Sequence, residues 1–325
     1  RIQVAEALSC QAEEIIFTGS GTEANNIAIQ GLIHAGDHII SSSYEHPSVL
    51  KVLQELEKDN VIVTYIKPIQ DGTIDPNEIE NNITDKTKLI SIMYANNELG
   101  SINPIPLIGE IAKKNNVIFH VDAVQCIGKI PVALKKLSVD LMSLSAHKFY
   151  GPKGVGSLYI KKGIHLNTLI SGGGQELDLR PGTENISGIA GLGLALKKSC
   201  DYLEKNTKYI KIMEDHFLSK LKEYKIKYIL PIRDHLPGVL AITFPKVDGQ
   251  SLLIALDLMG IAASFGSACS SGTTKASSTF LNIGMDENLA KSTLRISFGK
   301  IHSKEDIEYV ANSISNIIIR LSESN

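Results

Sequence analysis

The chain has 325 residues, 43% of them hydrophobic, and its 33 Lys and Arg residues nearly balance its 35 Asp and Glu residues. A formal net charge of −2 argues against broad nucleic-acid binding and against a basic surface that binds membranes. No apolar run approaches the about 20 residues of a membrane-spanning helix. At ~100–200 residues per domain, the length fits two domains of a soluble protein.

The cysteines are few and widely spaced. They form no CxxC or CxxH pair, so the sequence predicts neither a disulfide framework nor a metal site, and we expect a cytoplasmic protein. The first ten residues already follow a helical pattern. We therefore expect a natural N-terminal segment upstream of Arg1 that is missing here.

Short apolar runs alternate with helical patterns over the first half of the chain. The runs are rich in Val and Ile and apolar on both faces, which is typical of strands covered by helices on both sides. The alternation predicts an α/β fold with a mostly parallel sheet. Ligands bind beyond the carboxyl ends of such strands. We expect strands at 14–18, 37–43, 61–66, 88–95, 117–123, 140–146 and 156–162.

The pattern changes near residue 200. A Lys-rich helical stretch (201–224) leads to strands at 238–244 and 292–298, and a last helix has an apolar face between Ile307 and Leu321. These elements predict a smaller α/β domain. We place the large domain at 1–203 and the small C-terminal domain at 204–325.

The first strand runs into Thr-Gly-Ser-Gly-Thr-Glu, which puts Gly21 and Thr22 at the start of a helix. Backbone N–H groups and the helix dipole make such a start a phosphate-binding site. An ordinary helix cap with a short turn has the same pattern. This loop alone leaves both interpretations open.

Two charged residues follow later strands. Asp122 ends an apolar strand, where a carboxylate is costly to bury unless it is paired, although a helix N-cap would also explain it. Lys148 follows the strand at 140–146; it is either a surface lysine or a desolvated amine able to attack a carbonyl carbon. An Asp that pairs with a pyridinium nitrogen and a Lys that forms a Schiff base are what a pyridoxal phosphate (PLP) site requires.

Eight motifs resemble those of cysteine desulfurases of the NifS/IscS type, in the same order and from the first residues to about Gly299. These enzymes are class-V-aminotransferase-like PLP enzymes of fold type I. The resemblance implies a homodimeric sulfur transferase that converts L-cysteine to L-alanine through an enzyme persulfide, and so supplies iron–sulfur cluster assembly or another sulfur acceptor. The motifs are FTGSGTEANNIAIQG, YEHPSV, ANNELG, HVDAVQ, SAHKFYGPKGVGSLY, GGGQELDLRPGTEN, GSACSSG and STLRISFGK.

The resemblance also implies roles for single residues. Lys148 would hold PLP covalently and move the Cα proton, and Asp122 would keep the pyridine nitrogen protonated. Gln125 would bind the phenolate oxygen, and His46 would stack on the ring, although a His before Pro47 is also a common turn residue. The phosphate-binding residues would be Gly21, Thr22, Ser145 and His147, with Thr183 supplied by the other subunit of the dimer.

The substrate would be oriented by Asn97, which also borders the cofactor, and by Arg295, whose guanidinium would pair with the substrate carboxylate. Each residue has a simpler interpretation. Asn97 could cap a loop, Ser145 and His147 could be alternate positions on a strand, and Arg295 could form a buried structural ion pair.

In the resembled family the persulfide forms on the Cys of a Gly-Ser-Ala-Cys segment, which is Cys269 here. Most cysteines in apolar segments are inert, but this segment is rich in Gly and Ser. Cys126 is the competing thiol; we expect it inside a helix and favour Cys269.

Two rival functions remain. Another class-V activity, such as that of an aminotransferase, a kynureninase-like enzyme or a selenocysteine lyase, would share the fold; the Cys269 segment argues against it. A catalytically degenerate scaffold of a sulfur pathway would lack part of the site. The complete set argues against a scaffold: Lys148, Asp122, His46, Gln125, Arg295 and Cys269.

Overall fold

The computed structural model describes residues 1–264 and 276–323, and the chain divides into two compact units. Unit 1 comprises Arg1–Pro68, Thr73–Asn96 and Asn103–Leu203. Unit 2 comprises Glu204–Asn325 and two short segments from the first half of the chain, Ile69–Gly72 and Asn97–Ile102. A single cut in the sequence therefore does not separate the two units.

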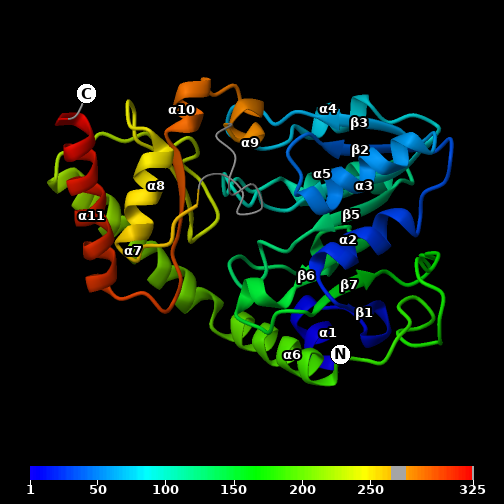
Figure 1. The fold of residues 1–325 in the computed structure, drawn as a ribbon. Coiled ribbons are helices and arrows are strands. Elements are labelled where there is room, and N and C mark those ends of the chain that lie inside the picture. Colours follow the sequence, from blue (N-terminus) through cyan, green and yellow to red (C-terminus); the bar gives the residue numbers. More distant parts are fainter. Residues whose placement is uncertain (265–275, 324–325) are drawn as a thin grey trace. The chain divides into compact units, whose positions relative to one another are not determined.

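Unit 1 contains a seven-stranded sheet with the order β1-β7-β6-β5-β4-β2-β3 (Figure 1). Neighbouring strands from β3 through β6 pair in parallel, and only β7 runs antiparallel to its neighbours β1 and β6. This confirms the predicted α/β class and the mostly parallel sheet. The strands are β1 (Ile15–Thr18), β2 (His38–Ser42), β3 (Ile62–Ile66), β4 (Thr87–Met93), β5 (Ile118–Asp122), β6 (Leu141–Ser145) and β7 (Gly156–Ile160).

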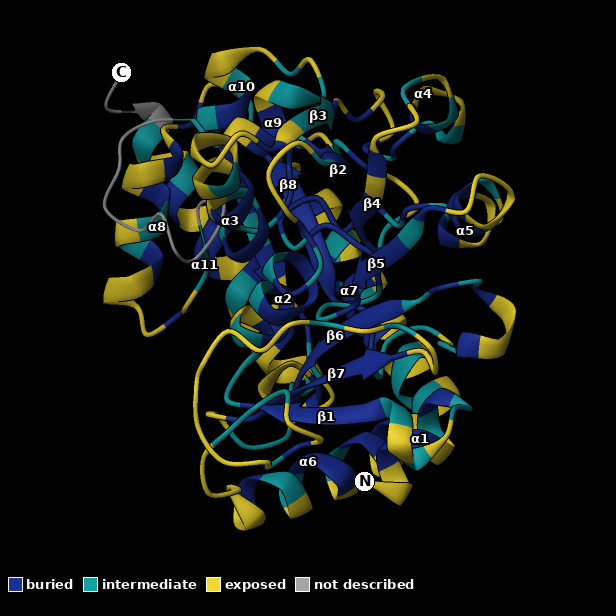
Figure 2. Ribbon diagram, turned by 90° about the vertical axis from the view of Figure 1, so that its right-hand side faces the viewer, coloured by how far each residue is buried: buried dark blue, intermediate teal, exposed yellow. Residues whose placement is uncertain are grey.

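Strands β6 and β7 are buried along their length, and β4 is buried except at Lys88, as their continuous apolar runs predict (Figure 2). The edge strand β3 is more exposed, and half of the Ile62 surface faces solvent. Helix α2 packs on β6 and β7, and α1 packs on α6. The helices are α1 (Ile2–Leu8), α2 (Gly21–Gln30), α3 (Pro47–Lys58), α4 (Pro76–Asn81), α5 (Ile105–Lys114) and α6 (Ile186–Asp201), with 3₁₀ turns η1 (Ala12–Glu14), η2 (Leu134–Lys136) and η3 (Ala146–Phe149).

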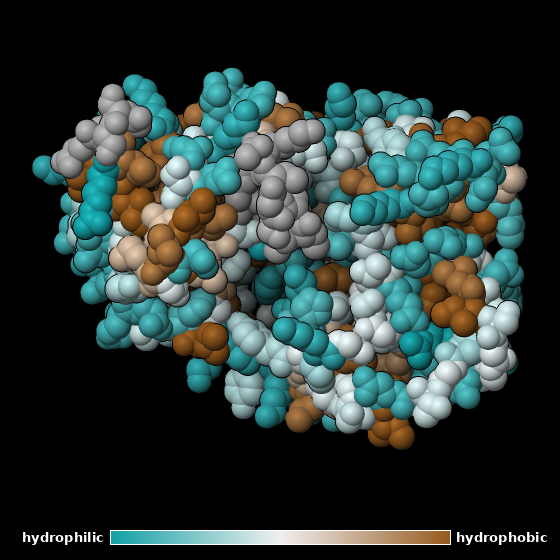
Figure 3. Space-filling view, viewed as in Figure 1, coloured by the Kyte–Doolittle hydropathy of each residue, from teal (hydrophilic) through white to brown (hydrophobic). Residues whose placement is uncertain are grey.

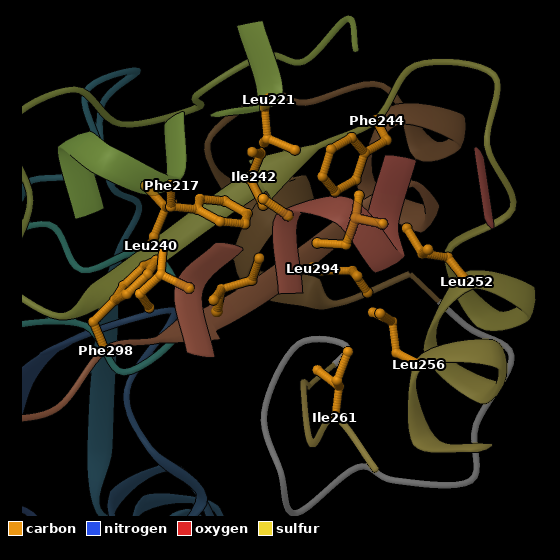
Figure 4. Packing of buried hydrophobic residues seen from close by; sticks show 14 of the residues in the cluster. Phe217, Leu221, Leu240, Ile242, Phe244, Leu252, Leu256, Ile261, Leu294 and Phe298 are labelled. Carbon is orange, nitrogen blue, oxygen red and sulfur yellow. The ribbon is translucent and has the colours of Figure 1, made fainter. Parts of the chain in front are cut away.

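Unit 2 is built on an antiparallel pair of strands, β8 (Val239–Thr243) and β9 (Thr293–Ser297). Its core gathers aromatic and aliphatic side chains from α7, β8 and β9, including Phe217, Ile242 and Leu294 (Figure 4). The last helix buries its apolar face, as its periodicity predicts. The helices are α7 (Leu203–Glu223), α8 (Gly249–Leu258), α9 (Ser278–Asn282), α10 (Glu287–Lys291) and α11 (Lys304–Glu323).

The surface of unit 2 carries apolar side chains over α8 (Figure 3). Ile254, Leu258 and Met259 are exposed there, Leu258 to 84%. Within the described part of the chain, no helix has the length and apolarity that a bilayer crossing requires.

Candidate active site

Asp122 is the last residue of β5, in register with Met93 of β4 and Ser143 of β6. Its carboxylate is buried. The Val124 N–H donates to Oδ1 at 3.0 Å, as in a local cap, but Oδ2 accepts a bond of 2.8 Å from Asn25 Nδ2 of helix α2. Burial raises the pKa of Asp122, whereas these two bonds and the charges of His46 and Lys148 oppose that rise. The local cap therefore explains only one of these two hydrogen bonds; the other comes from helix α2.

His46 is the N-cap of α3 and precedes Pro47, the first residue of the helix. Its Nδ1 accepts the Ser48 N–H at 3.1 Å and lies 2.8 Å from Ser48 Oγ. Ser48 Oγ in turn accepts a bond of 2.8 Å from Asn25 Nδ2. Burial lowers the pKa of His46, Asp122 opposes this and Lys148 lowers it further, which favours the neutral imidazole. A neutral ring held at its Nδ1 edge is suited to stacking on a flat aromatic ligand.

Lys148 lies in the 3₁₀ turn η3, directly after the carboxyl end of β6. Its side chain is exposed, and its charge affects the pKa values of both Asp122 and His46. The fold thus brings an ammonium, an imidazole and a carboxylate from three strand ends into electrostatic contact. In the sequence, Asp122 lies 76 positions after His46, and Lys148 lies 26 positions after Asp122.

The start of α2 lies against the ends of β5 and β6. A Cβ added at Gly21 would be 2.8 Å from Val124 Cγ2 and 3.2 Å from Ser145 Cβ, so only glycine fits this approach. Ser20 caps the helix by accepting the Glu23 N–H, and Thr22 is exposed. The helix therefore has the ordinary N-cap, at Ser20, and an exposed residue, Thr22, at the same N-terminus.

Ser145 and His147 complete the polar group near that helix start. Ser145 Oγ is 2.9 Å from His147 Nδ1. Burial lowers the pKa of His147, and Lys148 and Lys153 lower it further. A helix N-terminus, a hydroxyl and an imidazole are groups that bind phosphate oxygens, so these residues fit the phosphate of PLP.

The residues after Asp122 form turns and not the expected helix, so the prediction that Cys126 lies inside a helix is wrong. Gly128 has a φ of 74° and Pro131 follows, and neither is compatible with a continuing helix. Cys126 is fully buried, and burial raises the pKa of its thiol far above the usual value. The half-buried Gln125 accepts a bond of 3.2 Å from Lys129 Nζ.

Asn97 and Arg295 belong to unit 2, where the structure brings them together. Arg295 Nη1 donates to the backbone oxygen of Asn97 at 2.9 Å, and the Arg295 backbone exchanges two hydrogen bonds with Ser264. Arg295 is half-buried. Thr183 is exposed in unit 1, beside Gly182, and Cys269 lies outside the described residues.

Two residues of these networks are absent from the predicted site: Asn25 and Ser48. Asn25 lies four residues after Gly21, which places both on one face of α2. Ser48 follows His46 by two positions. Helical spacing from Gly21 is the signal that could have identified Asn25 in the sequence.

The chain is similar to known proteins over nearly its whole length. The aminotransferase class-V family model matches residues 1–310. The cysteine desulfurase IscS of Clostridium botulinum is 41% identical over 326 residues, covering 98% of this chain and 82% of that protein. The IscS of Methanosarcina thermophila is 42% identical, covering 99% of this chain and 81% of that one. A solved NifS-like protein superposes with a TM-score of 0.91 at 34% identity, covering 98% and 86% of the two chains.

Proposed function

The chain belongs to the aminotransferase class-V family and is a cysteine desulfurase, and we propose that unit 1 holds PLP and that L-cysteine is the substrate. The observation that carries this proposal is the buried carboxylate of Asp122, supported by Asn25 and electrostatically linked to His46 and Lys148. A carboxylate that burial destabilises gains most from a cation beside it, and a protonated pyridine nitrogen is such a cation.

Bound PLP supplies an electron sink for the charge released at the substrate Cα. Asp122 would accept the pyridine N–H, His46 would cover one ring face, and Gln125 would donate to the phenolate oxygen. Lys148 would hold the cofactor through Nζ and carry the Cα proton. The phosphate would be bound by Gly21, Thr22, Ser145 and His147.

Arg295 would receive the substrate carboxylate, with Asn97 beside it. The Cys269 thiolate would then attack the substrate sulfur; the carbon–sulfur bond breaks, a persulfide remains on Cys269, and proton uptake at carbon yields L-alanine. The other three thiols support this assignment. Burial raises the pKa of Cys10 to about 12 and also raises the pKa values of Cys126 and Cys200, which keeps these thiols protonated and poorly nucleophilic.

We further propose a homodimer in which Thr183 reaches the phosphate site of the second subunit. Exposed apolar residues of α6, Ile186 and Leu194, lie in the same part of unit 1 and support an interface there. The persulfide sulfur would pass to an iron–sulfur scaffold or another acceptor protein. The scattered cysteines favour the reducing cytoplasm.

The test uses Lys148→Ala, with the exposed Lys162→Ala as its control. Both proteins are incubated with L-cysteine, and alanine and sulfide are quantified; separately, each is reduced with borohydride in the presence of PLP and the modified peptide is sequenced. We expect alanine formation and covalent attachment to be lost only in Lys148→Ala. Attachment to another lysine would refute the role of Lys148, and a colourless wild-type protein would refute PLP binding.

A further inference from the structure

Glu98 follows Asn97 in the chain, and the proposed mechanism gives it no role. The residue as a whole is 7% exposed. Oε2 accepts a bond of 2.5 Å from Ser277 Oγ, and Oε1 accepts one of 3.2 Å from Thr279 Oγ1. Ser277 is the N-cap of α9, so Glu98 attaches the turn at Asn97 to the first residues of that helix.

The same turn supports the guanidinium of Arg295. Arg295 Nη1 donates to the backbone oxygen of Asn97, the residue whose peptide bond leads into Glu98. Burial raises the pKa of Glu98, whereas the bonds from Ser277 and Thr279 and the positive charge of Arg295 oppose that rise. The carbonyl that orients Arg295 therefore belongs to a peptide unit whose position depends on Glu98.

The far end of this short segment has its own anchor. Leu236 N–H donates to Gly100 O at 2.7 Å, and a Cβ at Gly100, where φ is 76°, would lie 2.7 Å from Val239 O. Gly100 thus holds one end of the segment tightly against β8. Glu98 holds the other end, so its loss should release Asn97 and leave the rest of unit 2 in place.

We propose that Glu98 is a positioning residue that orients Arg295, through the Asn97 carbonyl, for the carboxylate of an α-amino acid substrate. This inference rests on the proposed role of Arg295. A guanidinium binds a carboxylate strongly only when its planar donors face both oxygens, so a loose Asn97 carbonyl costs affinity for the carboxylate in particular. Binding of the substrate amine, which does not involve Arg295, should change little.

The experiment compares the holoenzyme with Glu98→Ala, Glu98→Gln and, as a control, the exposed Glu110→Ala. Binding is followed by the cofactor absorbance during titration with L-cysteine and with cysteamine, which has the same amine and thiol but lacks the carboxylate. We expect Glu98→Ala to weaken L-cysteine binding and raise its KM about tenfold or more, with kcat changed less and cysteamine binding within about twofold. Glu98→Gln keeps the size of the side chain and one acceptor oxygen, so its KM for L-cysteine should lie between those of the wild type and Glu98→Ala. Glu110→Ala should match the wild type.

Arg295→Ala, with the exposed Arg233→Ala as its control, separates this inference from the proposed function. If Arg295→Ala raises the KM for L-cysteine and both Glu98 variants do not, Glu98 does not position Arg295. Equal losses for L-cysteine and cysteamine in Glu98→Gln would assign Glu98 a general structural role and overturn the inference. If Arg295→Ala leaves L-cysteine binding unchanged, the proposed carboxylate site fails and the inference fails with it.

Discussion

Asn25 and Asp122 are 97 positions apart in the sequence, yet Asn25 Nδ2 lies 2.8 Å from Asp122 Oδ2. Both residues are buried, and the same amide nitrogen also donates to Ser48 Oγ beside His46. Helix α2 therefore contributes more than its N-terminus to the site. It supports the ionised form of the carboxylate that would pair with the cofactor.

Replacing Asn25 by Ala should weaken PLP binding. A hydrogen bond to a buried charged group contributes about 1.5–3 kcal/mol, so the dissociation constant should rise roughly tenfold or more. The loss should also raise the pKa of Asp122, because that bond now opposes the effect of burial. Equilibrium dialysis with PLP measures the change, and the adjacent Asn26→Ala, which loses two bonds within its own helix, is the control. Equal PLP affinity in the two variants would contradict the role of Asn25.

Replacing Cys269 by Ser should separate binding from sulfur transfer. The substrate amine and Cα do not need the thiol, so L-cysteine should still change the cofactor spectrum, but a hydroxyl cannot store sulfur and alanine release should stop. In the wild type, brief exposure to L-cysteine should add ~32 Da to the Cys269 peptide. Cys126→Ser should retain activity because the buried thiol stays protonated. Added mass on the Cys126 peptide would show that the wrong thiol was chosen.

Glu45 should make stability depend on pH. It accepts bonds from Ser42 Oγ and the Met93 N–H through Oε1, and burial raises its pKa to about 8. A carboxyl whose pKa is higher in the folded state contributes stability that is complete below the unfolded pKa, about 4.3, and is lost as the pH rises to about 8. Each pH unit in that window costs up to about 1.4 kcal/mol.

Glu45→Gln removes this dependence, since an amide does not titrate. Denaturant unfolding of the apoprotein at pH 6 and pH 8 should show the wild type losing roughly 2 kcal/mol relative to Glu45→Gln. Glu110→Gln, a change at an exposed position, should follow the wild type. Parallel pH profiles for the wild type and Glu45→Gln would mean that Glu45 is already ionised in the folded protein.

The sequence by itself determined the strands of unit 1, the helices other than the one expected at Cys126, and the places where chemistry could occur. Apolar runs bounded by turn residues are local properties, and each of the seven predicted strands is present in the sheet of unit 1. Asp122 ends β5 and Lys148 follows the end of β6, so the motifs at those strand ends could identify both residues from the chain alone. Local patterns are enough to predict these elements because the hydrophobic periodicity of a segment distinguishes a strand from a helix without reference to distant residues.

Only the tertiary structure decided which groups each of these residues contacts. Asn25 reaches Asp122, the segment at Asn97 and Glu98 joins Arg295 in unit 2, and Cys126 is buried in turns. No local sequence pattern predicts these contacts or the burial of Cys126. Burial and hydrogen-bond pairing depend on residues tens to hundreds of positions apart, and they set the charge of a carboxylate, the orientation of a guanidinium and the reactivity of a thiol.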